Sequence, residues 1–405
     1  MKMKNMIVVA GIVCSSFSSA YATGTDVYIT GSSAFRGALM AYLRGKLTNT
    51  RATFDKATNA DPTLSVDASS FIVMSGNWDA DNSHRTTFFL SFTGSVAGIR
   101  DVAGPVAQTF LVKPSDFETN DNYKLATSPY GVKATVTKNA DGSLASPAFP
   151  HNADFGFSDV FQESTIYTNP LIDTPVAVLP FTWITAPGGS AAGITNMTPQ
   201  IAQTLFKTGT LSLSLFTGAA GDASKLVYAL GRTDDSGTRM SAMAETGVGV
   251  SATLKQYYPV GNPVTSYTLT GSGGNSGYVS GGDLSTIMKN ATTAANGFNV
   301  SYMGISDADA TTPSGAAYLS HNGVLYSSDL ATAKAQVTEG KYTFWCYEHL
   351  IDRNDLTDAD DALKVLNKLK NDLPTAFTST RKTIRLDEMN VYRTTDGDTV
   401  YRKGL

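Results

Sequence analysis

Cysteine is nearly absent from this chain, which has two among its 405 residues, Cys14 and Cys346. Cys14 lies in an N-terminal segment that we expect to be cleaved off, so the remaining chain cannot form an internal disulfide. The fold must therefore be stabilised by its hydrophobic core. Cys346 lies in the apolar run YTFWCYEHL, where we expect a buried, unreactive thiol.

Histidine is scarce too, and the sequence lacks the usual motifs of enzymes and metal sites. Its four histidines lie in no C-x-x-C or H-E-x-x-H pattern, and there is no Walker A sequence. We therefore expect no metal and no cofactor. No G-x-S-x-G turn occurs. A serine such as that of DDSG (234–237) can still lie next to a histidine in the folded protein, because the residues of a catalytic triad need not be close in sequence. A secreted serine hydrolase stays an alternative.

The chain contains little charge and no run of basic residues. Charged residues make up 16% and apolar residues 42%, which is typical of a globular protein with a sizeable core. Cleavage of the N-terminal segment leaves 29 of the 31 basic side chains against 35 acidic ones. Neither nucleic acid nor an anionic membrane is an expected partner.

The N-terminus has the features of an export signal. Lys2 and Lys4 precede a short apolar run at 6–13, and Ala20-Tyr21-Ala22 is a small-x-small cleavage site. We expect a signal peptide at 1–22, cleaved after Ala22, and a periplasmic or secreted protein. No later stretch is apolar enough to cross a membrane, so no membrane insertion is expected after cleavage.

Strands alternate with helices along the chain. DVYIT (26–30) predicts a strand, and Phe35, Leu39 and Leu43 follow at helical spacing. TTFFLSF (86–92), TPVAVLPFTWI (174–184) and LVYAL (226–230) predict further strands. Thr198 and Pro199 predict a helix start, and DADDALKVLNKLKNDLP predicts a late amphipathic helix. This alternation predicts an α/β fold.

In some stretches the apolar residues follow neither the spacing of a helix nor that of a strand. The segments 48–85 and 100–150 are polar, with scattered turn signals, and we interpret them as insertions or long loops. The segment 267–282 is rich in glycine and serine and predicts a flexible loop.

Three strand-to-turn segments end in small hydroxyl residues and glycine: GSSAF, TGSVAG and DSGT. A helix N-terminus presents unpaired backbone N–H groups, and it binds anions without needing a cation. Arg232, just before the third turn, can supply a bidentate guanidinium for a tetrahedral oxyanion. Asp234 can hold that guanidinium in place. One such turn alone is more simply explained as a helix cap, but three together with an arginine indicate an anion site.

In these segments the chain resembles the periplasmic phosphate-binding proteins of ABC uptake systems, which have the type II periplasmic binding fold. The resemblance lies in ITGSSAFRGAL, FTGSVAGI, FGFSDV, PVAVLPFTWI, TNMTPQIAQTLFKTG and RTDDSGT, in the family's order. It spans roughly residues 26–240 and is looser in the C-terminal third.

The resemblance implies a phosphate site built from several turns. Its ligand-binding residues would be Ser33, Phe35 through its backbone N–H, Ser95, Asp159, Arg232, Ser236, Gly237 and Thr238. Asp159 would accept a proton from the bound phosphate, and Asp234 would orient Arg232. Ala34 stands where many relatives have threonine, and Ser32 or Ser33 would replace the lost hydroxyl.

The resemblance also implies two α/β lobes with the ligand cleft between them, joined by crossover strands. Lobe 1 would comprise 23–180 and lobe 2 would comprise 181–335, with 336–405 returning to lobe 1. The expected protein is a monomeric, non-enzymatic receptor that delivers inorganic phosphate to an ABC transporter permease. The alternative within this fold is a receptor for another oxyanion, a sensor or a surface protein.

Overall fold

The computed structural model describes residues 24–56, 66–78, 85–104, 106–125, 131–139, 143–271, 273–291, 297–353, 355–357 and 361–404. The expected signal peptide at 1–22 lies outside the described residues.

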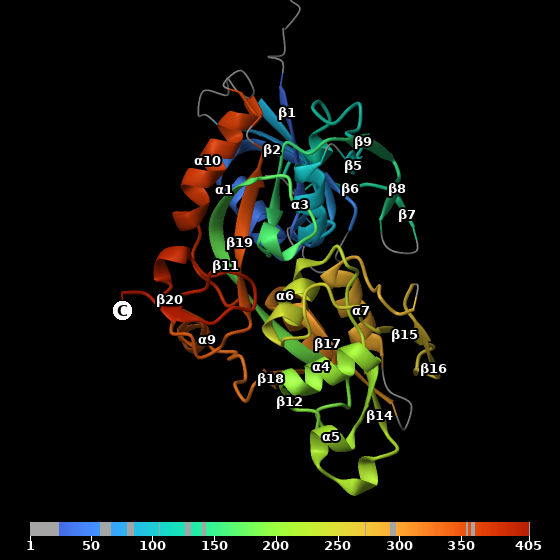
Figure 1. Ribbon diagram of the computed structural model, residues 1–405. Coiled ribbons are helices and arrows are strands. Elements are labelled where there is room, and N and C mark those ends of the chain that lie inside the picture. The colour runs from blue at the N-terminus through green and yellow to red at the C-terminus, as the bar shows by residue number, and fades with distance from the viewer. Residues whose placement is uncertain are drawn as a thin grey trace, which may run out of the picture.

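A mixed sheet of 13 strands in the described part of the chain forms the centre of the molecule. Its main path runs β13-β14-β17-β11-β19-β10-β1-β4-β3-β2-β6. We call the part beyond β19 the upper half, as it is seen in Figure 1. Its strands are β10 (Phe155–Ser158), β1 (Thr25–Gly31), β4 (Arg85–Ser91), β3 (Phe71–Asn77), β2 (Thr48–Phe54) and β6 (Val132–Lys133). Its helices are α1 (Arg36–Lys46), α3 (Ser95–Ala103) and α10 (Asp361–Ala376).

The remaining strands of the sheet form the lower half of Figure 1. They are β13 (Thr210–Ser212), β14 (Leu226–Ala229), β17 (Gly297–Gly304), β18 (Ala317–His321) and β12 (Asn196–Met197). The helices around them are α4 (Pro199–Thr208), α5 (Ser214–Thr217), α6 (Gly237–Glu245), α7 (Gly281–Asn290) and α8 (Ile305–Thr311). Helix α9 (Leu330–Thr338) lies near the C-terminal hairpin (Figure 1).

Four two-stranded sheets complete the fold in the described residues. They are β5 (Gln108–Leu111) with β9 (Ala148–His151), β7 (Thr137–Lys138) with β8 (Leu144–Ser146), β15 (Tyr257–Val260) with β16 (Ser266–Leu269), and β20 (Val391–Tyr392) with β21 (Tyr401–Arg402).

Two long strands, β11 (Ile172–Thr185) and β19 (Trp345–Asp352), join the halves. β11 pairs with β19 as far as Pro180 and with β17 from Phe181 onwards. Its residues from Val176 to Thr185 are all buried, which explains the long apolar run in the sequence. β19 pairs in turn with β10 of the upper half. The predicted α/β architecture, with crossing strands between two halves, is confirmed.

Each of three strands is followed directly by a turn and a helix, as the sequence predicts. α1 follows β1, α3 follows β4 and α6 follows β14. β1 lies parallel to both β4 and β10, so the turns after them meet at one edge of the sheet. The helix predicted at Thr198 is confirmed, since the Thr198 hydroxyl accepts a hydrogen bond from the Ile201 N–H and Pro199 is its first residue. The late amphipathic helix is α10.

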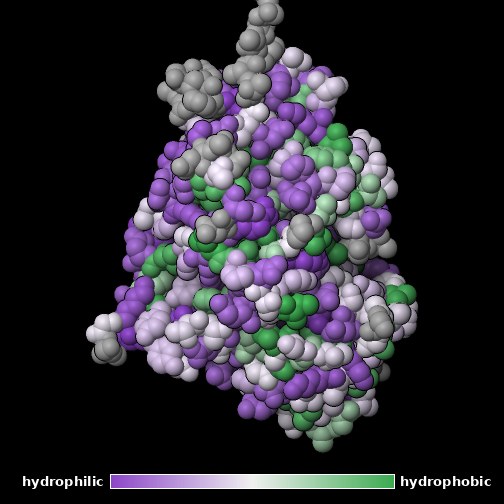
Figure 2. All heavy atoms as spheres, turned by 45° about the horizontal axis from the view of Figure 1, so that its top comes forward, coloured by the Kyte–Doolittle hydropathy of each residue, from purple (hydrophilic) through white to green (hydrophobic). Residues whose placement is uncertain are grey.

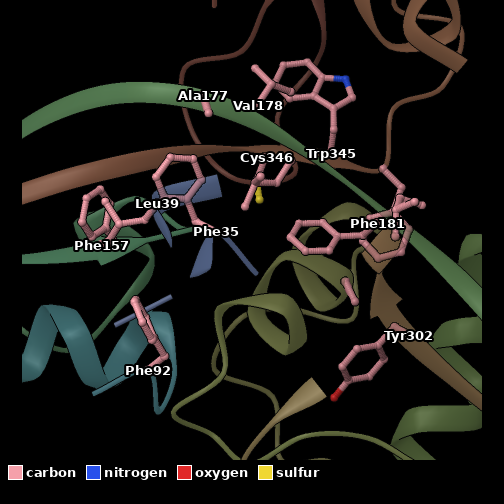
Figure 3. Close-up of a cluster of buried hydrophobic side chains, with 14 of the residues drawn as sticks. Phe35, Leu39, Phe92, Phe157, Ala177, Val178, Phe181, Tyr302, Trp345 and Cys346 are labelled. Carbon is pink, nitrogen blue, oxygen red and sulfur yellow. The ribbon is translucent and has the colours of Figure 1, made fainter. Parts of the chain in front are cut away.

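One hydrophobic cluster extends through both halves (Figure 3). Phe35 and Phe157 come from the upper half, and Phe181 and Tyr302 lie toward the lower half, with Cys346 of β19 between them. Burial raises the pKa of the Cys346 thiol well above its usual value, which disfavours the reactive thiolate. The predicted buried thiol is confirmed.

The interpretation of 48–85 as an insertion or loop is wrong for its described residues, because β2 and β3 lie there, inside the main sheet. Every residue of β3 is buried. A strand that is covered on both faces need not alternate apolar and polar residues, so the usual signal of a strand is missing. The described residues of 100–150 include the end of α3 and the small sheets formed by β5, β7, β8 and β9.

No helix in the described residues is long and apolar enough to cross a membrane. On the face shown in Figure 2, apolar side chains form separate groups among polar ones.

Candidate functional site

The first turn, between β1 and α1, is fixed against the neighbouring strand. Gly31 has φ +114°, and a Cβ there would lie 1.9 Å from the Phe157 carbonyl oxygen, so glycine is required. The Ser32 hydroxyl accepts a hydrogen bond from the Phe35 N–H (3.3 Å) and donates one to Glu348 Oε2 (3.0 Å). The Phe35 N–H therefore has a partner within its own turn. Ser33 is half-buried in the wall of the cavity described below.

The second turn brings α3 against the loop that precedes α6. Gly94 has φ +144°, and a Cβ there would lie 2.3 Å from the Asp235 carbonyl oxygen. That oxygen accepts hydrogen bonds from the N–H groups of Val96 and Ala97 (3.1 and 3.4 Å). Ser95, the first residue of α3, is buried beside Gly237 and Asp159. The turn thus connects the upper half to the lower half.

Asp159 lies at the centre of the candidate site. It follows β10, its side chain is 1% exposed, and its Oδ1 has no hydrogen-bond partner among the described residues. Thr238 donates to its Oδ2 at 3.3 Å. Burial raises the pKa of Asp159, while the hydroxyl of Ser95, the charge of Arg232 and the hydroxyl of Thr238 act to lower it. A buried carboxyl oxygen without a partner leaves one hydrogen bond to be made.

Arg232 is buried next to this carboxylate, but it is not held by Asp234. Its Nε donates to the Tyr278 carbonyl (2.9 Å) and its Nη2 to the Val279 carbonyl (2.6 Å). Asp234 is exposed, and the predicted orienting role is corrected to these two carbonyls. They belong to the glycine- and serine-rich segment that was expected to be a flexible loop.

The charge of Arg232 is surrounded by carboxylates. Burial lowers the pKa of its guanidinium, and Asp307 is the strongest of the charged groups that raise it, with Asp159 and Asp283 contributing further. The sequence reasoning missed Asp307, which lies in α8, far along the chain from the three turns.

The third turn caps α6 and carries its first two N–H groups to the site. The Ser236 hydroxyl accepts from the Arg239 N–H (3.2 Å), so this side chain is the helix cap. Gly237 and Thr238 are the first two residues of α6, whose N–H groups have no acceptor inside the helix. The structure therefore brings together Ser95, Asp159, Gly237 and Thr238, with Arg232 close enough to act on Asp159.

Asp235 and Glu348 also belong to this region and were not predicted. Asp235 forms an ion pair with Arg100 of α3 at 2.8 Å, across the two halves. Glu348 of β19 is fully buried and bonded to Ser32. Its one sequence signal is a charged residue inside the apolar run YTFWCYEHL.

A cavity of about 1040 Å³ lies between α1 of the upper half and α7 and α8 of the lower half. Ser33 and Asp307 are among its lining residues, so it reaches the neighbourhood of Arg232. Lys56, Lys289 and Lys382 also line it, and none of the three forms a salt bridge with a described residue.

The other acidic residues of the wall are neutralised by arginines. Asp67 is paired with Arg44, and Asp309 is paired with Arg381 at 3.0 Å. The unpaired lysines therefore give the cavity an excess of positive charge, which attracts anions.

Replacing Gly237 by alanine should destabilise the protein. The added Cβ would lie 1.6 Å from Asp159 Oδ1 and 2.7 Å from Ser95 Cβ, so one of the two buried side chains must move. Overpacking of this kind costs about 1–3 kcal/mol, which thermal or denaturant unfolding will measure. Gly221→Ala is the control, since a Cβ there meets no atom within 4 Å. Equal stability of the two variants would show that the contact is not as tight as described.

Three comparisons relate the chain to known proteins. No protein-family model matches it, and no curated protein matches it significantly. Among solved structures, a Clostridium perfringens protein assigned as a phosphate ABC transporter substrate-binding protein, with phosphate bound, is 12% identical, with a TM-score of 0.47 over 89% of this chain and 100% of that one.

Two further solved structures are similar. An ABC-type phosphate transport receptor from Vibrio cholerae is 12% identical, with a TM-score of 0.42 over 85% of this chain and 93% of its own. PstS from Borrelia burgdorferi is 13% identical, with a TM-score of 0.37 over 87% of this chain and 93% of its own. Because these TM-scores are below 0.5, the fold and site described above rest on the coordinates of this chain alone.

Proposed function

We propose that this protein is an exported receptor that binds inorganic phosphate between its two halves and delivers it to an ABC transporter permease. The observation that carries the proposal is the Asp159 carboxyl group, buried with one unpartnered oxygen beside the N-terminus of α6, Ser95 of α3 and a buried arginine. A carboxylate in an anion site is favourable when the anion itself carries a proton. Phosphate near neutral pH does so, and sulfate does not.

The surrounding groups suit a tetrahedral oxyanion. The first N–H groups of α6 can donate to its oxygens, and Ser33, Ser95 and Thr238 provide hydroxyls. Arg232 supplies a positive charge from a side chain that is 3% exposed, and charge-assisted hydrogen bonds are the strong ones. Ser236 and the Phe35 N–H support the site indirectly, since each has a partner inside its own turn.

The positively charged cavity provides a route to this site. Its unpaired lysines raise the local concentration of anions, and Ser33 lies where the cavity meets the first turn. The predicted signal peptide at 1–22 supports export to the periplasm or beyond. Delivery to a permease and the monomeric state are parts of this proposal, and another oxyanion or a sensory role is its nearest alternative.

The histidines of the described residues favour a receptor over a serine hydrolase. His349 is fully buried, and its Nδ1 lies 2.8 Å from Asp173 Oδ1. Ser158 lies opposite it in the sheet, but the Ser158 hydroxyl donates to the Val160 carbonyl. His321 lies between Trp183 and Glu245. His151 stacks on Tyr28, and its Nδ1 lies 2.8 Å from the Asn152 carbonyl oxygen. None of these three described histidines has a serine hydroxyl as a hydrogen-bond partner.

Thermal unfolding with added anions tests the proposal. Phosphate and arsenate should raise the melting temperature, because a ligand at 100 times its Kd stabilises the folded state by about 2.7 kcal/mol. Sulfate at the same ionic strength should leave the melting temperature unchanged. An equal shift with sulfate would identify a receptor for another anion, and no shift with any of the three would contradict an oxyanion site.

A further inference from the structure

Glu348 is a second buried carboxyl group beside the candidate anion site. It lies in β19, is 0% exposed, and accepts a hydrogen bond from the Ser32 hydroxyl through Oε2. Its Oε1 has no partner among the described residues. Charged side chains are almost never fully buried without a partner, so a carboxyl group in this position needs an explanation.

Glu348 and Asp159 are chain neighbours of one residue pair in the sheet. β10 and β19 are antiparallel, and the last pair of their ladder is Ser158 with His349. Asp159 directly follows the Ser158 of this pair, at the end of β10, and Glu348 directly precedes its His349 in β19. The two unpartnered carboxyl oxygens therefore belong to neighbouring groups, and the charge of Asp159 acts on Glu348.

The charged and titratable groups around Glu348 are mostly acidic. Asp159 comes from the end of β10. Cys346 lies two residues before Glu348 in β19, and the charges of Asp159 and Glu348 both raise the pKa of its thiol. The pKa of Asp396, from the C-terminal segment, is raised to about 6, chiefly by burial and in part by the charge of Asp159. β11 presents Ala177 opposite Glu348, and the turn after β1 presents the Ser32 hydroxyl.

Arg232 is a buried cation of this region, and it acts on Asp159. The influences on Glu348 among the described residues are its burial, Asp159 and Ser32, of which the first two raise its pKa well above the usual value. Asp307 and Asp283 act on Arg232 as well as Asp159, so the charge of Arg232 is already shared among several carboxylates. Ionisation of Glu348 adds a further negative charge before any anion enters.

We propose that Glu348 is a proton-dependent gate for the anion site: its neutral form admits the anion, and its ionised form excludes it. This inference rests on the proposed function, since it concerns the same site. The class of ligand is a protonated tetrahedral oxyanion, whose negative charge would be repelled by a second carboxylate. By linkage, a bound anion favours protonation of Glu348 as much as that proton favours the anion.

The sign of the pH effect follows from this linkage. At pH values below the pKa of Glu348 in the folded protein, Glu348 is neutral, and its ionisation does not affect the affinity for phosphate. As the pH rises through that pKa, affinity falls, by up to about tenfold per pH unit, because one proton must be taken up with each anion. Glutamine at this position has the neutral form's shape and cannot ionise.

Phosphate titrations of wild type and Glu348→Gln between pH 6 and pH 9.5 test the proposal. The ratio of their affinities removes the titration of phosphate itself, which is common to both proteins. We expect the affinity of wild type, divided by that of Glu348→Gln, to fall at least fivefold between the acidic and the alkaline end of this range. Glu163→Gln, at an exposed glutamate, is the matched control and should follow wild type. Glu348→Met is a second uncharged variant, should Glu348→Gln fail to fold.

Isothermal calorimetry in two buffers of different ionisation enthalpy supplies an independent readout. At the alkaline end, wild type should take up more protons per bound phosphate than Glu348→Gln. A constant affinity ratio across the pH range, with equal proton uptake, would overturn the gate while leaving phosphate binding intact. Absence of phosphate binding by all the proteins, wild type included, would instead overturn the proposed function.

Discussion

Arg232→Ala is expected to bind phosphate at least about 30-fold more weakly than wild type, while remaining folded. Arg232 is the buried cation that acts on Asp159, and its guanidinium is fixed by two backbone carbonyls. Truncating one partner of a buried charge-assisted pair costs about 2–5 kcal/mol, which corresponds to a factor of roughly 30 to several thousand in Kd. Calorimetric titration with phosphate measures the change directly.

Two further variants make the Arg232 result specific. Arg385→Ala removes a partly exposed guanidinium that is paired with Asp387, and it should keep the wild-type affinity. Arg232→Lys keeps the charge but loses the planar group that the Tyr278 and Val279 carbonyls hold in place, so we expect an intermediate affinity. If Arg232→Ala binds phosphate as wild type does, with an unchanged melting temperature, Arg232 does not belong to the site.

Asp159→Asn is expected to change which anion is bound. Wild type should prefer phosphate to sulfate by roughly 10⁴-fold, as sites built around a ligand hydroxyl do, because Asp159 Oδ1 needs a hydrogen bond that sulfate cannot donate. The asparagine amide can donate to an unprotonated oxygen. The preference should therefore shrink by at least 100-fold, which competition titrations with both anions will measure.

The raised pKa of Asp159 adds a pH dependence to this selectivity. Burial favours the protonated carboxyl group, and a protonated Asp159 can itself donate to sulfate. As the pH falls, competition by sulfate should therefore strengthen more in wild type than in Asp159→Asn, because the two proteins share only the titration of phosphate itself. If wild type binds sulfate as tightly as phosphate at pH 8, the selectivity argument is wrong.

The strand–turn–helix units could be predicted from the sequence because their signals are local. An apolar run, a glycine turn and the helical spacing of Phe35, Leu39 and Leu43 all lie within a few residues of one another. The buried strands β2 and β3 could not be predicted, since strands covered on both faces lose the alternation that marks a half-exposed strand.

The candidate site was predictable only where its residues lie in the three turns or in FGFSDV, one of the segments that carry the resemblance. Ser95 and Asp159 follow β4 and β10, which lie parallel to β1 on either side and so end at one edge of the sheet. Gly237 and Thr238 reach them from the lower half. Glu348 lies near Asp159 because β10 and β19, two strands almost 200 residues apart in the sequence, pair antiparallel as far as Ser158 and His349. No local pattern encodes that register.

The groups that hold Arg232 could not be predicted from the local sequence either. Asp234 is close in sequence, but the turn carries it into solvent. The carbonyls of Tyr278 and Val279 hold the guanidinium instead, and backbone carbonyls carry no sequence signature. A segment rich in glycine and serine can approach an arginine closely because it has few bulky side chains.

Calorimetric titration of the wild-type protein with phosphate, followed by sulfate, tests the central claim most directly. The site described here predicts one phosphate per chain, and no detectable heat from sulfate at the same concentration and pH 8. Absence of phosphate binding, or sulfate binding of equal strength, would contradict the assignment of Asp159 and its neighbours to a site for a protonated tetrahedral oxyanion.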